Sequence, residues 1–102
     1  MTDIMQPLNI VQNIIDKLDL SLTYVYDDLV FIEQAVILIQ FDKKNQKTLM
    51  LFLHKDMSTN IQDQMIDRFS EAAKQYEVTV NYNGRFELLE NAENHEVDIV
   101  FH

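Results

Sequence analysis

The sequence predicts an α+β fold with two layers, in which a mainly antiparallel sheet of five to six strands carries two helices on it. Two segments, 7–18 and 57–76, repeat apolar residues at the helical period. The other segments are short and either apolar or alternating, which is typical of strands. Most of them are joined by short polar turns, and such turns connect antiparallel neighbours. The length of 102 residues is that of one domain, which we place at 1–102.

The first helix is expected over residues 7–18. Leu8, Val11 and Ile15 recur on one stripe, and polar residues fill the opposite side. Pro7 suits the first helical turn, where a backbone N–H has no partner within the helix.

Residues 20–32 change to a strand pattern. Two runs of aromatic and β-branched residues, 22–26 and 29–32, are separated by Asp27-Asp28. This pattern fits either a hairpin with a tight acidic turn or one bulged strand, and the sequence leaves both open.

A second hairpin is expected from strands 36–41 and 48–53, joined by the polar turn 42–47. Both faces of these middle strands are apolar, which distinguishes them from strands that have one face in water. Their second face is covered either by residues 29–32 and the curvature of the sheet, or by another protein chain. For the second case we expect a homodimer, since two-fold symmetry lets one patch meet itself. The candidate interface residues are Val36, Leu38, Met50 and Phe52.

The second helix is expected over residues 57–76, followed by strands 78–82 and 85–89. The dipeptide Asn83-Gly84 between them predicts a hairpin with a type I′ turn. An acidic loop, 91–96, then leads to a last strand, 97–102. Apolar residues alternate cleanly through this region, which predicts one core face and one wet face. The core face is expected to hold Val78, Val80, Tyr82, Phe86, Leu88, Val97, Ile99 and Phe101, and the wet face Thr79, Asn81, Arg85, Glu87, Asp98 and His102.

The expected order of elements is α-β-β-β-α-β-β-β, give or take one strand. This order is similar to that of type III secretion chaperones, which add a further C-terminal helix. The resemblance is one of architecture and implies a protein that binds another protein.

Composition excludes several classes of function. The chain has no Cys, which excludes disulfides, thiol nucleophiles and thiolate zinc sites. Its single Gly excludes both a P-loop and a dinucleotide-binding fingerprint. The start lacks the pattern of a secretory signal, and apolar runs reach only five residues, 35–39 and 49–53, so we expect a cytoplasmic protein.

The net charge is −9, and most of it falls after Lys55. A field of this sign repels nucleic acid and anionic membranes, so neither is an expected partner. Lys43, Lys44 and Lys47 form a basic cluster, which we interpret as the solvated tip of a hairpin rather than a binding site.

Catalytic, cofactor and metal sites are not predicted. His54, His95 and His102 stand near carboxylates, but in no spacing that matches a known ligand pattern, and we interpret them as loop and strand-end residues. His102 and Asp98 are expected on one strand face. Asp27-Asp28 is interpreted as a turn rather than an acid–base pair.

By elimination, the sequence predicts a small acidic cytoplasmic protein-binding module of inhibitor, immunity, adaptor or chaperone type, without catalytic activity or cofactor. Its partner would be another protein, itself, or both. The alternatives are a small enzyme with a site that one sequence does not reveal, and an acidic mimic of nucleic acid.

Overall fold

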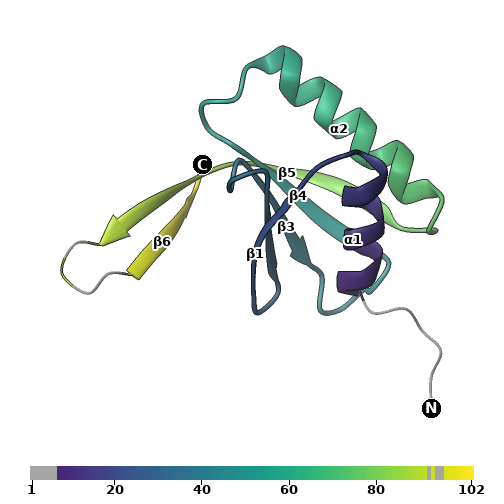
Figure 1. Cartoon of the computed structure of the whole chain (residues 1–102), viewed down its shortest axis with the longest axis horizontal. Helices are drawn as coiled ribbons and strands as arrows, with labels where there is room; N and C mark the ends of the chain where they lie inside the picture. Colours follow the sequence, from purple (N-terminus) through teal and green to yellow (C-terminus); the bar gives the residue numbers. More distant parts are fainter. Residues whose placement is uncertain (1–6, 92, 94–95) are drawn as a thin grey trace.

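The computed structural model describes residues 7–91, 93 and 96–102. In this part of the chain, two helices and a six-stranded sheet follow one another as α-β-β-β-β-α-β-β (Figure 1), which confirms the predicted α+β class. The elements are α1 (Pro7–Lys17), β1 (Leu22–Tyr26), β2 (Leu29–Ile32), β3 (Ile37–Phe41), β4 (Thr48–His54), α2 (Thr59–Lys74), β5 (Thr79–Asn91) and β6 (Glu96–Phe101).

The strands lie in the sheet in their order along the chain. Strands β1 to β4 form an antiparallel meander, and β5 pairs antiparallel with β6. Only β4 and β5 are parallel, because α2 carries the chain back across the sheet between them. The tight acidic turn is formed, since Tyr26 pairs with Leu29 across Asp27-Asp28.

Both helices pack on one face of the sheet. The buried side chains of α1 (Val11, Ile14, Ile15) and α2 (Phe69, Ala72, Ala73) meet those of β3 and β4 (Ile37, Ile39, Leu49, Leu51, Leu53). Helix α2 begins after Ser58, whose hydroxyl accepts a hydrogen bond from Ile61 N at 3.3 Å. Neither helix of the described residues is long and apolar enough to cross a lipid bilayer.

The opposite face has a smaller core of its own. Phe31, Leu38, Phe52 and Phe86 are buried there, and Met50 packs against them. The ring of Phe101 in β6 contributes to the cover, with its centroid 4.8 Å from that of Phe52. This face is therefore covered by the curvature of the sheet and not by a helix. In Figure 1 the end of β5 and all of β6 project to one side of the strands β1 to β4.

The predicted hairpin at Asn83-Gly84 is wrong, since β5 runs through both residues as one strand. Leu51 pairs with Tyr82 and Phe52 pairs with Gly84, so Asn83 is an extra residue. Such a one-residue excess is a β-bulge. Gly84 has φ 125°, which a glycine adopts without strain. The Asn-Gly pair thus supplies a bulge instead of a turn.

The bulge changes which face the side chains of β5 occupy. Before it, Val80 and Tyr82 pack against the helix-side core. After it, Phe86 and Leu88 belong to the opposite core. The prediction of a single core face through residues 78–88 is wrong for this reason, because one inserted residue reverses the alternation.

Replacing Gly84 by Val is expected to lower the free energy of unfolding by about 1–3 kcal/mol. A β-branched residue is strained at φ 125°, and its Cβ would stand 3.2 Å from the His102 carbonyl oxygen. The urea midpoint measures the effect. Asn83→Ala, at the exposed neighbouring position, is the control and should shift stability by no more than about 0.5 kcal/mol. Equal midpoints for Gly84→Val and the wild type would contradict the bulge.

Candidate functional site

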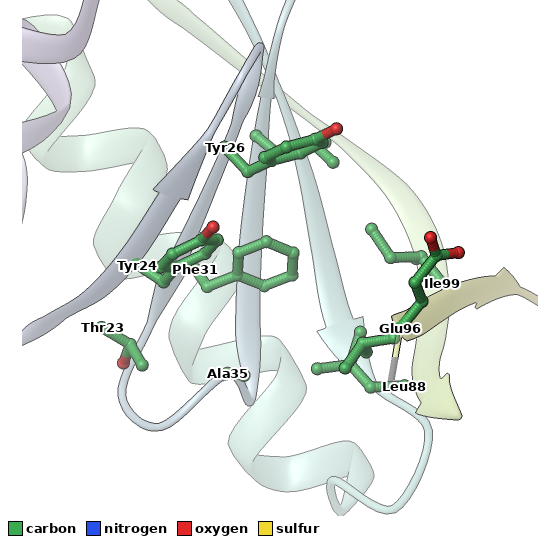
Figure 2. Close-up of a pocket in the computed structure, with 10 residues that line it drawn as sticks. Thr23, Tyr24, Tyr26, Phe31, Ala35, Leu88, Glu96 and Ile99 are labelled. Carbon is green, nitrogen blue, oxygen red and sulfur yellow. The ribbon is translucent and has the colours of Figure 1, made fainter. Parts of the chain in front are cut away.

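An open groove of about 630 Å³ lies on the sheet face away from the helices. Ten residues from β1, β2, the β2–β3 turn, β5 and β6 line it (Figure 2). Buried Phe31 and half-buried Leu88 and Ile99 connect the groove to the smaller core beneath it. The groove is therefore the part of the apolar face that the curved sheet leaves uncovered.

The first wall of the groove consists of tyrosines on the edge strand β1. Tyr24 and Tyr26 lie on the groove side, whereas Val25 between them packs against the helix-side core. The ring of Tyr24 is tilted against Phe31 with a centroid distance of 6.2 Å. Tyr24 and Tyr26 remain 58% and 63% exposed, so more than half of the surface of each residue is in contact with solvent.

The second wall is β6, which places Val97 and Ile99 across from the tyrosines. Val97 is 57% exposed and pairs with Glu90 of β5. Among the ten described lining residues, Glu96 is the charged one, and Figure 2 shows its carboxylate beside Ile99. Phe101, also exposed by half, extends the apolar surface along the same strand.

A strained turn closes one end of the groove. Glu33, Gln34 and Ala35 have φ values of 53°, 57° and 66°, a left-handed conformation that residues other than glycine rarely adopt. The turn is fixed to β1, because Ser21 N donates to Glu33 Oε1 at 2.7 Å and Gln34 N donates to Thr23 Oγ1 at 2.7 Å. Ala35 and Thr23 both line the groove, so these bonds hold its end in place.

The candidate interface residues lie on the predicted strands, on the face away from the helices, but most of their surface is covered. Leu38 is fully buried, Phe52 is 7% exposed, Met50 is half-buried and Val36 is 37% exposed. In the single chain, Leu38 and Phe52 therefore expose almost no surface, whereas Met50 and Val36 are partly exposed. The curved sheet covers the middle strands, and the exposed apolar residues lie at its two edges. The sequence analysis missed Tyr24 and Tyr26, although aromatic residues in an alternating strand were a signal for them. It placed Val97 on a core face, and this is wrong, since Val97 is 57% exposed.

Arg85, expected on a wet face, is half-buried and organises the connection between β4 and α2. Its Nη1 donates to the carbonyl oxygens of His54 at 2.8 Å and Met57 at 2.7 Å. Its Nε and Nη2 donate to Gln62 Oε1. The bulge at Gly84 brings Arg85 to the helix side, so its charge points away from the groove.

Glu87 lies on the same side as Arg85 and accepts a charged hydrogen bond. Lys55 Nζ is 2.5 Å from Glu87 Oε2, and His102 Nε2 is 3.6 Å from Glu87 Oε1. The hydrogen bond from Lys55 holds the pKa of Glu87 below its usual value, and the same bond raises the pKa of Lys55.

The histidines occupy separate places. His54 Nδ1 accepts a hydrogen bond from Asp56 N at 3.1 Å, and its ring meets Phe86 edge-on. The ion pair of His102 is with Glu87 rather than Asp98, and His95 lies outside the described residues. Within the described part of the chain, no three His, Asp or Glu side chains stand close enough to share a metal ion.

The remaining charged candidates are in turns. Asp27 has φ 54°, and Asp28 Oδ2 accepts from Gln40 Nε2 at 3.1 Å. Lys44 N donates to Asp42 Oδ1 at 2.9 Å in the β3–β4 connection, where the basic cluster was expected. Asp27-Asp28 therefore stabilises the tight turn of its hairpin.

Replacing Glu87 by Gln is expected to destabilise the protein at neutral pH and not at strongly acid pH. A carboxylate with a lowered pKa contributes stability above its unfolded pKa, and this contribution is lost as pH falls through the folded pKa. Urea unfolding of both proteins across the acid range measures the difference.

Glu71→Gln is the matched control for this prediction, since Glu71 also pairs with a lysine. Its side chain is 79% exposed, against 16% for Glu87, and its oxygen is 3.5 Å from Lys74 Nζ. Such an exposed pair contributes little. A stability loss in Glu87→Gln that persists unchanged into strong acid would contradict the assignment.

Comparison of the chain with models of known protein families, with curated proteins and with solved structures finds no match.

Proposed function

We propose that this chain is a small cytoplasmic protein-binding module that uses the groove between β1 and β6 to hold a partner and carries out no chemistry of its own. The observation that carries the proposal is the gathering of exposed apolar side chains on one concave face. Tyr24, Tyr26, Val97 and Phe101 are all at least half exposed and belong to this face.

Burial by a partner would stabilise these residues. A large apolar side chain gains about 1.5–3 kcal/mol when it moves from water to a packed interior. Tyrosines concentrate binding energy at protein interfaces, because a rigid ring buries much area and keeps a polar tip. The hydrogen bond from Gln34 N to Thr23 Oγ1 fixes one end of the groove. A fixed wall loses little conformational entropy when a partner binds, and this favours binding further.

The shape and lining support a protein partner over an enclosed substrate. Pockets for small molecules usually surround most of the ligand, whereas both tyrosines and Val97 leave more than half of their own surface open. An enzyme would also need a base held beside a nucleophile or substrate atom. The described part of the lining instead offers one carboxylate, two phenols and one threonine hydroxyl among apolar residues.

Affinity capture from the native lysate tests this function, with the wild type, a Tyr24→Ser/Val97→Ser groove variant and a Leu89→Ser control. Leu89 is also 50% exposed, but it follows Leu88 in β5 and faces away from the groove. A partner protein should be retained by the wild type and by the control and lost with the groove variant. Retention by all three proteins would contradict the groove as the binding site.

The same capture at two salt concentrations separates the alternatives. Binding through apolar contacts should survive an increase in salt, whereas a mimic of nucleic acid would release a DNA-binding partner steeply. Suppose that DNA-binding proteins are recovered, that they are released at high salt, and that the groove variant retains them as well as the wild type does. This result would favour the nucleic-acid mimic instead.

A further inference from the structure

We infer that the groove takes a cationic amphipathic segment of the partner, with apolar side chains in the groove and Lys or Arg side chains against its acidic rim. This inference rests on the proposed function and adds the chemistry of the ligand.

Among the residues that the structure describes, those with a charge in and beside the groove are acidic. Of the described lining residues, Glu96 is the charged one. Asp27 and Asp28 connect Tyr26 of the first wall to Leu29 of β2, and Tyr26 and Leu29 both line the groove. Glu90 pairs with Val97 in the second wall, on the groove side of β5 by alternation from Leu88. A ligand lying between β1 and β6 would therefore meet carboxylates at both walls.

Basic residues are nearly absent from the sheet. Among the residues assigned to the six strands, Arg85 is the one Lys or Arg. Its guanidinium is bound to Gln62 and to carbonyl oxygens of the β4–α2 connection. Lys55, just after β4, is paired with Glu87. The described strands therefore add little positive charge to the acidic rim.

The tyrosines suit a cationic ligand as well as an apolar one. The exposed face of a phenol ring attracts an ammonium or guanidinium group. Lys and Arg also bury their methylene stems on apolar surface while the charged end stays in water. Tyr24 and Tyr26, each more than half exposed, can receive such stems next to the apolar side chains that fill the groove.

A second copy of the chain fits the groove less well. Each copy has a net charge of −9, and two acidic rims brought together repel each other. The same repulsion disfavours acidic peptides, nucleic acid and anionic lipid. Charge complementarity therefore selects a basic partner from the possible occupants.

Three short synthetic peptides test the inference by fluorescence anisotropy. In each, Leu alternates with a second residue, which is Lys, Ser or Glu. The Leu/Lys peptide should bind at least about tenfold more tightly than the Leu/Glu peptide, with Leu/Ser between them, and the difference should shrink from about 0.05 M to about 0.5 M salt. The Tyr24→Ser/Val97→Ser variant should weaken the Leu/Lys peptide about tenfold or more, and Leu89→Ser should not.

Glu96→Gln isolates the charge of the lining, with Glu71→Gln on α2 as the matched control. Removing the groove carboxylate should weaken the Leu/Lys peptide about twofold to fivefold, the range for an exposed charge pair, and removing the carboxylate on α2 should change little. Equal weakening by both variants would mean that the peptide responds to net charge alone, and this would overturn the inference.

The outcomes also separate the inference from the proposed function. Binding of all three peptides with equal affinity, lost in the groove variant, would overturn the cationic ligand and keep a protein-binding groove. If no peptide binds in a way that the groove variant weakens, both the cationic ligand and the protein-binding groove are overturned. A wild-type protein that sediments as a dimer at micromolar concentration, and as a monomer in the groove variant, would make a second copy the occupant and overturn the cationic ligand.

Discussion

The extra residue at Asn83-Gly84 determines how this sheet divides its side chains between two cores. Strands β3 and β4 are apolar on both faces, and the two helices cover only one of them. A regular β5 would send Val80, Tyr82, Phe86 and Leu88 all to the helix side. The bulge instead assigns Tyr82 to the helix-side core and Phe86 to the opposite core. One residue in the left-handed region of φ thus lets a single strand serve both faces.

The same bulge determines on which face of the sheet the charged side chains of β5 lie. With Phe86 and Leu88 turned to the groove side, Arg85 and Glu87 must turn to the helix side. There Arg85 satisfies carbonyl oxygens of the β4–α2 connection, and Glu87 accepts from Lys55. A backbone carbonyl oxygen that is buried in a loop costs stability unless it accepts a hydrogen bond. The strand that completes the apolar cover therefore also fixes the connection that leads into α2.

Most of the fold could be predicted from the sequence, because its signals are local. The helical stripes, the acidic turn at Asp27-Asp28 and the middle hairpin depend on neighbours within a few residues, and each is found in the structure. The role of Asn83-Gly84 could not be predicted in this way. A turn and a bulge place the same demand on Gly84, and the choice depends on the parallel pairing with β4, which is distant in the sequence. The groove was missed for a related reason, since β1 and β6 are brought together only by the curvature of the whole sheet.

The properties of the groove depend on where the sheet exposes apolar and charged side chains. Leu38 and Phe52, in the middle of the sheet, are covered by the chain itself, so the exposed apolar surface lies at the edges. Edge strands in many proteins carry lysines, which discourage pairing with other molecules. Here β1 carries no charged residue, and β6 carries Glu96 and Asp98. Acidic residues protect an edge from a second acidic copy as well as lysines would, but they do not repel a basic partner. Under the proposed function, the carboxylates of β6 and the open tyrosines of β1, across the groove from them, would favour a basic partner, which would link the net charge of −9 to the groove.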